Sequence, residues 1–221
     1  MRVWCSGNMR AFQALVTSSI LVTRLLNKTM KNTPNQNSFF YHNASITPEV
    51  VQFILDELKD RDKTKAGTNR NGKEDYHPDT RKSDIYWISD TGWVAGMMSH
   101  FVNLANTIKY KYDIGYWADS IQYTEYNGDG AHYSLHADTA PSIRIKTDIR
   151  KLSISLCLSR KEDYEGGELV FPGEYIVGKN SHKMDIGDVI VFPSDFHHKV
   201  NPVTSGRRIA LVGWYAGPPW R

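Results

Sequence analysis

The sequence predicts an α+β fold in which two helices precede and support an antiparallel β-sandwich or barrel. Two observations carry this prediction. Apolar residues recur at helical spacing in two segments between residues 47 and 111, whereas after Gly115 the pattern changes to period two, in short runs broken by Gly, Pro, Asn and Asp. The composition, with 40% hydrophobic and 12% aromatic residues, is that of a globular protein.

Two helices are expected in the first half of the chain. The run Thr-Pro-Glu at residues 47–49 is typical of a helix start, with a hydroxyl N-cap, a proline in the first turn and an acid near the positive end. The first helix should therefore cover residues 47–60, and the second, which carries a stripe of methionine and aromatic residues, should cover 93–110. Residues 61–84 are polar and densely charged, which predicts a long mobile loop of the kind that often forms a lid or binding loop.

Short strands are expected in the second half. Each is bounded by turn residues, and such a series is typical of an antiparallel sandwich or barrel. The seven strands are expected at residues 121–126, 132–138, 151–158, 168–171, 188–192, 198–203 and 208–214.

The charge of the chain is unevenly distributed. The formal net charge is +3, but residues 1–48 contain five bases and no acid, which leaves 22 bases against 24 acids in the remainder. A nucleic-acid partner is therefore not expected. A membrane partner is not expected either, because no apolar run reaches the roughly 18 residues of a membrane helix. Cys5 and Cys157 are too few for a disulfide framework or a Cys-rich zinc site, so a reducing, cytoplasmic location is expected.

Residues 1–37 are expected to lie outside the fold, with residues 38–221 forming a single domain. Gln13 and the hydroxyl residues 17–19 interrupt the apolar run that a secretory signal requires. An acid-free stretch with arginines and hydroxyl residues also resembles an organelle transit peptide. An upstream extension, with the true start at Met30, is the interpretation that we favour, and targeting to an organelle stays open.

Two segments of the β region predict a metal site. His136 and Asp138 are two residues apart, so on a strand their side chains would point to the same face and could share one metal ion. Taken alone, this pair is equally compatible with a histidine beside a turn aspartate. The segment 192–203 offers His197 and His198 as a third ligand. Two histidines and one carboxylate leave open coordination positions, which is typical of non-haem Fe(II) that activates O₂.

An arginine follows the third ligand by about ten residues. Arg207 and Arg208 both precede an apolar strand. A guanidinium that faces the interior could bind a dicarboxylate co-substrate through paired hydrogen bonds. A surface salt bridge is the alternative role.

Taken in order, these motifs resemble the 2-oxoglutarate/Fe(II) dioxygenase superfamily, and its prolyl 4-hydroxylase-like branch (the type of the alpha-subunit catalytic domain) in particular. The resemblance implies a double-stranded β-helix, or jelly-roll, core at residues 119–217, with supporting helices at 47–111. It covers residues 121–217 and is carried by Tyr126-x6-Tyr133-x2-His136-x-Asp138, Gly166-Gly167-Glu168-Leu169, Phe192-Pro193-Ser194, His198-x-Val200-x-Pro202-Val203, Gly206-x-Arg208 and Trp214.

The resemblance also implies residue roles. His136, Asp138 and His198 would ligate Fe(II) and form the catalytic centre, and the family spacing selects His198 over His197. Arg208, selected over Arg207 in the same way, would bind the distal carboxylate of 2-oxoglutarate. Tyr126 matches a family tyrosine that hydrogen-bonds this co-substrate.

Further residues are expected around the pocket. Cys157 stands where some prolyl hydroxylases place a second tyrosine over the co-substrate. Candidate substrate contacts, by position only, are residues 61–84, the insertion at 139–148 and Trp87. The other residues expected to line the pocket are Tyr133, His132 and Trp214.

The implied activity is hydroxylation of a C–H bond, with a peptidyl residue, proline first, as the expected substrate. O₂ and 2-oxoglutarate would be consumed, succinate and CO₂ released, and ascorbate would act as a reductant. A hydroxylase of a free amino acid or other small molecule stays open. A nucleic-acid demethylase is disfavoured, because those enzymes carry a second arginine where Trp214 stands here. A non-catalytic jelly-roll binding module would have lost a ligand, and a zinc hydrolase would leave Arg208 without a role. No oligomeric state is predicted.

Overall fold

The computed structural model describes residues 39–70, 73–172 and 180–220. The leader predicted at residues 1–37 lies outside the described residues. Among those described, no helix has the length and apolar character needed to cross a membrane. The helices are α2 (Pro48–Leu58), α3 (Trp93–Ala105) and the π-helical turn η1 (Asn106–Tyr110).

The strands are mostly short, and all their pairings are antiparallel. In chain order they are β1 (Phe40–His42), β2 (Thr64–Lys65), β3 (Thr68–Arg70), β4 (Lys73–Asp75), β5 (Arg81–Lys82), β6 (Asp84–Ile88), β7 (Tyr116–Trp117), β8 (Ile121–Asn127), β9 (Ala131–His136), β10 (Ile149–Cys157), β11 (Tyr164–Gly166), β12 (Leu169–Val170), β13 (Ser181–His182), β14 (Val189–Pro193) and β15 (His198–Gly217).

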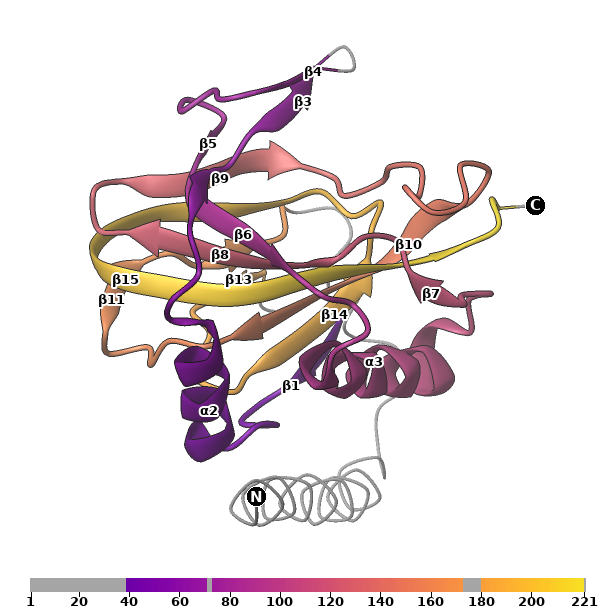
Figure 1. The fold of residues 1–221 in the computed structure, drawn as a ribbon, viewed down its shortest axis with the longest axis horizontal. Coiled ribbons are helices and arrows are strands. Elements are labelled where there is room, and N and C mark those ends of the chain that lie inside the picture. Colours follow the sequence, from indigo (N-terminus) through magenta and orange to yellow (C-terminus); the bar gives the residue numbers. More distant parts are fainter. Residues whose placement is uncertain (1–38, 71–72, 173–179, 221) are drawn as a thin grey trace.

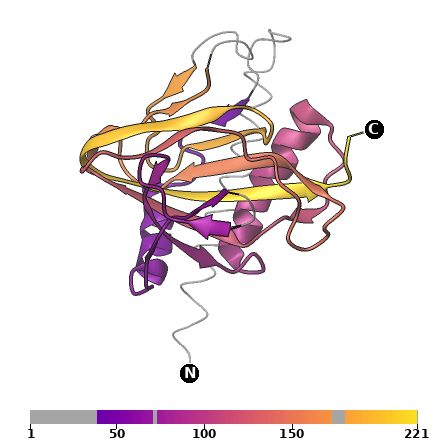
Figure 2. The same cartoon turned by 90° about the horizontal axis from the view of Figure 1, so that it is seen from above.

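The long strand β15 joins two sheets. Its C-terminal half lies between β10 and β8 in a sheet of order β1-β14-β10-β15-β8-β6-β2. Its N-terminal half pairs instead with β9, β11 and β12, and β5 and β13 complete this second sheet. Figures 1 and 2 show β15 running along the whole β region. Two antiparallel sheets that share a strand in this way are consistent with the predicted jelly-roll core.

Both predicted helices are confirmed, and they cover one side of the larger sheet (Figure 1). Thr47 occupies the N-cap position of α2, but its side chain makes no cap hydrogen bond. The α-helical part of the second helix ends at Ala105 and continues as η1. Both helices contribute apolar residues to one core cluster that includes Leu152, Ile154 and Leu156, which alternate along β10 and are fully buried.

The prediction of a single long loop at residues 61–84 is wrong. This segment contains the hairpin β3–β4, which projects away from the helices in Figure 1, and the short strands β2 and β5. The neighbouring strand β6, which was not predicted, pairs with β8 and extends the larger sheet. The strands of two or three residues are held by backbone pairing with neighbours and have no periodic apolar pattern, so composition alone indicated a loop.

The two strands predicted at residues 198–203 and 208–214 are one continuous strand. Gly206 was interpreted as a turn, and it does have a φ of 71°. Pairing nevertheless continues on both sides of it, because Gly206 lies opposite Tyr164 and Arg207 lies opposite Asn127. A Cβ atom at Gly206 would lie 1.9 Å from the carbonyl oxygen of Asp163. The glycine therefore marks the place where β15 leaves one sheet and enters the other.

Candidate active site

A cavity of about 650 Å³ opens among the strands of both sheets. Side chains alternate along β8, β10 and β15, so that one face of each strand packs toward the helices and the other faces this cavity. Most of the cavity-facing positions on these strands carry polar groups where a plain core would be apolar. They are Gln122, Thr124 and Tyr126 on β8, Ser155 on β10, and Arg208, Val212 and Trp214 on β15.

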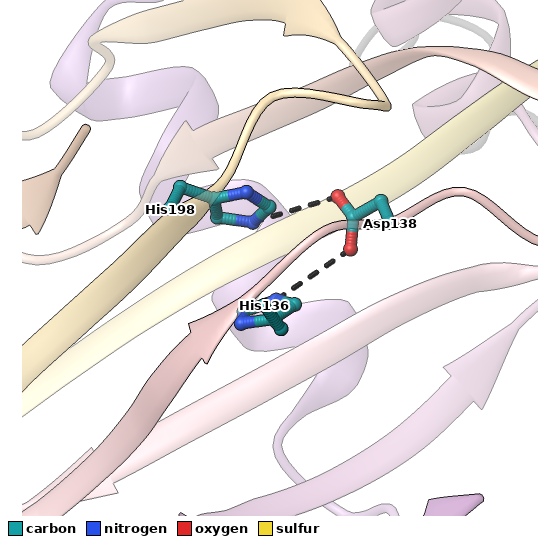
Figure 3. A group of neighbouring side chains, drawn as sticks. All are labelled: His136, Asp138 and His198. Atoms are coloured by element: carbon teal, nitrogen blue, oxygen red, sulfur yellow. Dashed lines mark ion pairs between the residues drawn. The ribbon is translucent and has the colours of Figure 1, made fainter. Parts of the chain in front are cut away.

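His136 and His198 lie directly opposite each other on β9 and β15, and their ring centroids are 4.2 Å apart. The prediction that Asp138 shares a strand with His136 is wrong, because β9 ends at His136. Instead, the backbone N–H of Asp138 donates to the carbonyl of Ser194, 2.8 Å away, and the Asp138 carboxylate lies beside both rings. Figure 3 shows the resulting cluster.

The three side chains have the geometry of a metal site. One carboxylate oxygen of Asp138 is 3.6 Å from Nε2 of His136, and the other is 3.6 Å from Nε2 of His198. One potential ligand atom from each residue lies within 4.8 Å of the others. A metal ion that takes up one nitrogen or oxygen from each, at about 2 Å, fits this spacing. His197, the competing candidate, is exposed to solvent.

Backbone carbonyls orient both rings. Nδ1 of His136 lies 2.8 Å from the carbonyl of Ser134, and Nδ1 of His198 lies 2.9 Å from the carbonyl of Phe196. Donation from Nδ1–H to these carbonyls leaves the lone pair of Nε2 pointing at the cluster. This arrangement is the usual support of metal-binding histidines.

The protonation states of Asp138 and His198 favour binding of a cation. Burial opposes ionisation of Asp138, but the imidazoles of His198 and His136 and the hydroxyl of Ser153 outweigh it and hold the pKa of Asp138 well below its usual value. Burial lowers the pKa of His198. At neutral pH the site therefore contains an ionised carboxylate and a neutral His198. The carboxylate is fixed further by Ser153, which donates to Asp138 at 2.7 Å and lies 2.9 Å from the hydroxyl of Ser194.

Arg208 reaches the same cavity from β15, the strand that also carries His198. The prediction had placed it on a separate, following strand. It is 2% exposed and lies opposite Tyr126 on β8, with its guanidinium carbon 5.4 Å from the centre of that ring. Among the described residues, its Nε–H has no hydrogen-bond partner. By contrast, the side chain of Arg207 is 57% exposed and lies near Glu125. Because a buried, unpaired N–H is unfavourable, Arg208 has the capacity to bind a ligand in the cavity.

Two of the other predicted pocket residues line the cavity, and two do not. Tyr133 stacks on His136 with a centroid distance of 3.6 Å, and Trp214 presents a buried indole N–H that has no partner among the described residues. His132 is absent from the described lining, and its ring nitrogens instead lie near the carbonyls of Gly130 and Asp79. Cys157 is fully buried behind the cavity, with its thiol directed at the carbonyl of Ser159.

A bulge in β9 explains why Tyr133 and His136 share a face. The two residues are three positions apart, but they pair with Val200 and His198, which are two positions apart on β15. The extra residue shifts the alternation by one, so that side chains an odd number apart point the same way. The sequence pattern indicated the strand but not this shift.

Several cavity residues were not predicted. Arg81 and Gln122 line one wall, and Arg150 lines another, where it forms an ion pair with Asp119 at 2.5 Å. The positions proposed as substrate contacts also reach the cavity, through Gly67, Trp87 and part of the insertion at 139–148. The sequence did contain a signal for such residues, because polar side chains occupy alternate positions on strands whose other face is apolar.

Comparison with known proteins agrees with this geometry. Residues 121–216 match the sequence model of the 2OG-Fe(II) oxygenase superfamily. A PKHD-type hydroxylase from Idiomarina loihiensis is 42% identical over 85 residues, which cover 38% of this chain and 37% of the relative. A second one, from Psychrobacter sp., is 44% identical over 91 residues, which cover 38% of this chain and 33% of the relative. The matched segment thus spans about a third of the length of these curated relatives.

Solved structures share the fold. A Pseudomonas putida prolyl-4-hydroxylase superposes with a TM-score of 0.63 at 18% identity and covers 83% of this chain and 94% of its own. A prolyl hydroxylase from Trichoplax adhaerens, in complex with a peptide fragment of hypoxia inducible factor, gives 0.61 at 18% identity and covers 97% and 93%. Residues 121–216 thus resemble the 2OG-Fe(II) oxygenase superfamily in sequence, and the chain has the double-stranded β-helix fold of these prolyl hydroxylases.

Proposed function

We propose that this protein is a 2-oxoglutarate- and Fe(II)-dependent dioxygenase that hydroxylates a C–H bond, with a peptidyl prolyl residue as the first candidate substrate. One observation carries the proposal. The cluster of His136, Asp138 and His198 opens into the same cavity as the buried Arg208, whose Nε–H has no partner among the described residues. A triad with open coordination positions and a guanidinium with spare donors together suit a metal-bound dicarboxylate.

His136, Asp138 and His198 are the proposed iron ligands. The low pKa values of Asp138 and His198 mean that neither has to lose a proton before it binds a cation at neutral pH. The mixed N/O donor set without cysteine suits Fe(II) better than a structural zinc. When bound, iron would supply the activation of O₂, with 2-oxoglutarate converted to succinate and CO₂.

Arg208 and Tyr126 are the proposed co-substrate residues. The cross-strand pairing of the two residues places the tyrosine ring beside the guanidinium, so both can contact one carboxylate. Trp214 would add an N–H donor on the same face of β15, six residues further along. The apolar side chains of Leu169, Phe192 and Val200 complete the lining and would help to exclude water from the reacting groups.

A peptide substrate is the first candidate because the structural neighbours include a prolyl hydroxylase with a bound peptide fragment. We further propose that ascorbate returns over-oxidised iron to Fe(II), and that the protein works in the cytoplasm as a single domain of residues 38–221. The low cysteine content supports this compartment.

Release of succinate from 2-oxoglutarate by the Fe(II)-loaded full chain tests the proposal, with and without proline-rich peptides. We expect Fe(II)-dependent succinate release, stimulation by a subset of the peptides, and a product peptide heavier by one oxygen atom. His136→Ala should abolish turnover. His132→Ala is the matched control, because His132 is on the same strand and outside the cavity lining, and it should leave turnover intact. Turnover that survives His136→Ala, or wild-type protein that forms no succinate, would contradict the proposal.

A further inference from the structure

Arg81 is a buried cation in the wall of the cavity, on the strand β5 that flanks β9. It is 7% exposed, lines the cavity and lies opposite Tyr133 in the strand register. Its guanidinium carbon is 4.5 Å from the centre of the Tyr133 ring, and that ring in turn stacks on His136. The Tyr133 ring therefore separates Arg81 from His136, a proposed iron ligand.

No described side chain neutralises the charge of Arg81. Its Nε–H donates to the Ser83 hydroxyl at 3.1 Å and its Nη2–H to the Gln122 side-chain oxygen at 2.7 Å, and both acceptors are neutral. Within the part of the chain whose side chains the structure describes, Arg81 forms no ion pair. The stacked Tyr133 ring offers a cation–π contact, which stabilises a cation by only about 0.5–2 kcal/mol.

Arg150 shows the contrast in the same cavity. It also stacks on an aromatic ring, that of Trp214, but Asp119 lies 2.5 Å from its guanidinium and neutralises it. A buried charge that has no counterion is unfavourable, and an arginine cannot escape by losing its proton. Because Arg150 has a counterion and Arg81 has none among the described residues, we infer that the counterion of Arg81 arrives with a ligand.

The proposed 2-oxoglutarate site at Arg208 does not supply this counterion. Arg208 contacts Tyr126 and Met184, whereas Arg81 contacts Tyr133, Ser83 and Gln122, so the two guanidinium groups reach the cavity with separate sets of neighbours. Two of the five donors of Arg81, those on Nη1, make no hydrogen bond to the described residues and remain for an anion such as a carboxylate.

We propose that Arg81 binds a carboxylate of the substrate. The inference rests on the proposed hydroxylase function and adds a substrate class to it. The carboxylate belongs either to an acidic residue next to the hydroxylated position of a peptide or to a free amino acid. Both sources present the same planar anion to the guanidinium.

Matched pairs of probes test this inference. One pair is a prolyl peptide with glutamate beside the proline and the same peptide with glutamine, and the other pair is L-proline and L-prolinamide. Probe-dependent succinate release is measured above the release without probe. For the wild-type protein we expect the carboxylate member of one pair to be favoured about tenfold or more in kcat/KM, as the loss of one charge-assisted hydrogen bond predicts. The pair that responds identifies the source of the carboxylate.

Variants at β5 complete the experiment. Arg81→Gln should remove the preference for the carboxylate probe. Arg81→Lys should retain part of it, because lysine keeps the positive charge but lacks the paired N–H donors of the guanidinium. Lys82→Gln is the matched control, since Lys82 is the neighbour on the same strand, binds Asp129 and lies outside the cavity lining. It should keep the full preference.

The outcomes separate this inference from the proposed function. Binding of Fe(II) and 2-oxoglutarate by the wild-type protein, and its succinate release without probe, report on the proposed function alone. The inference is overturned if the wild-type protein favours neither carboxylate probe, or if Arg81→Gln retains the preference. If Arg81→Gln does not fold, the wild-type probe pairs and Arg81→Lys still decide the question.

Discussion

His136 and His198 are cross-strand partners on β9 and β15, although 61 residues separate them in the sequence. Residues directly opposite on antiparallel strands have Cβ atoms about 5 Å apart, which is close enough for two imidazoles to share one ion. The backbone register thus brings the two proposed nitrogen ligands together, and the backbone of Asp138, the proposed oxygen ligand, is held beside them by its N–H bond to the Ser194 carbonyl.

Ser153 should act as a positioning residue for Asp138. Its hydroxyl donates to the carboxylate at 2.7 Å and is buried. Ser153→Ala should weaken metal binding about 10- to 100-fold, the usual effect of losing such an outer contact. Ser134→Ala is the control, because Ser134 supports His136 through its backbone carbonyl, which the substitution keeps. Calorimetric titration with Fe(II) under anaerobic conditions measures both variants, and equal affinities would refute the role.

Arg208 should control the affinity for 2-oxoglutarate without affecting the metal. Arg208→Gln removes a charge-assisted contact and should weaken 2-oxoglutarate binding about 100-fold. Arg207→Gln, at the exposed neighbouring position, should bind it like the wild-type protein. Titration of the metal-loaded variants with 2-oxoglutarate distinguishes them. The reverse pattern would show that Arg207 binds the co-substrate.

Cys157 should be unreactive in the folded protein. Burial raises the pKa of its thiol, so the reactive thiolate is scarce at neutral pH, and the side chain is fully buried. Iodoacetamide at about pH 8, where an ordinary cysteine is already partly ionised, should label the peptide that contains Cys157 only after denaturation. Mass spectrometry of the digested protein measures this. Rapid labelling of the native protein would mean that Cys157 is open to the cavity.

Gly206 should be required for the crossing of β15 between the sheets. Gly206→Ala places a side chain at a φ of 71° and against the carbonyl of Asp163, so it should lower the free energy of unfolding by at least about 2 kcal/mol. Gly96→Ala is the control. Gly96 is exposed within α3, has open space around its Cβ position, and should gain up to about 1 kcal/mol from the better helix propensity of alanine. Urea unfolding measures both, and equal stabilities would contradict this reading of β15.

Much of the fold could be predicted because period-two and helical patterns are local. The two helices and the strands β8, β10 and β14 all carry such patterns, and the structure confirms them. The strands of the segment 61–84 could not be predicted, because backbone pairing with distant neighbours holds them and their side chains show no alternation. The continuity of β15 was missed for a related reason, since a left-handed glycine indicates a turn unless partner strands on both sides carry the chain through it.

The site shows the same division. Residue type and spacing led to His136 and Asp138, and the resemblance to the dioxygenase family selected His198 and Arg208 over their neighbours. The structure brings all four to one cavity. Arg81 and the other unpredicted wall residues depend on strand register and on the bulge in β9, which a single sequence does not encode in any local pattern. His132 was a reasonable candidate by alternation, and the same bulge removes it from the cavity face.

The central claim is that His136, Asp138 and His198 together hold one iron. The most direct measurement is the stoichiometry of Fe(II) bound anaerobically by the wild-type protein, His198→Ala and His197→Ala, determined by metal analysis after desalting. His197 is the exposed neighbour of the proposed ligand and has the same side chain. The account predicts one iron per chain for the wild-type protein and His197→Ala, and almost none for His198→Ala. A full equivalent of iron on His198→Ala, or its loss from His197→Ala, would contradict it.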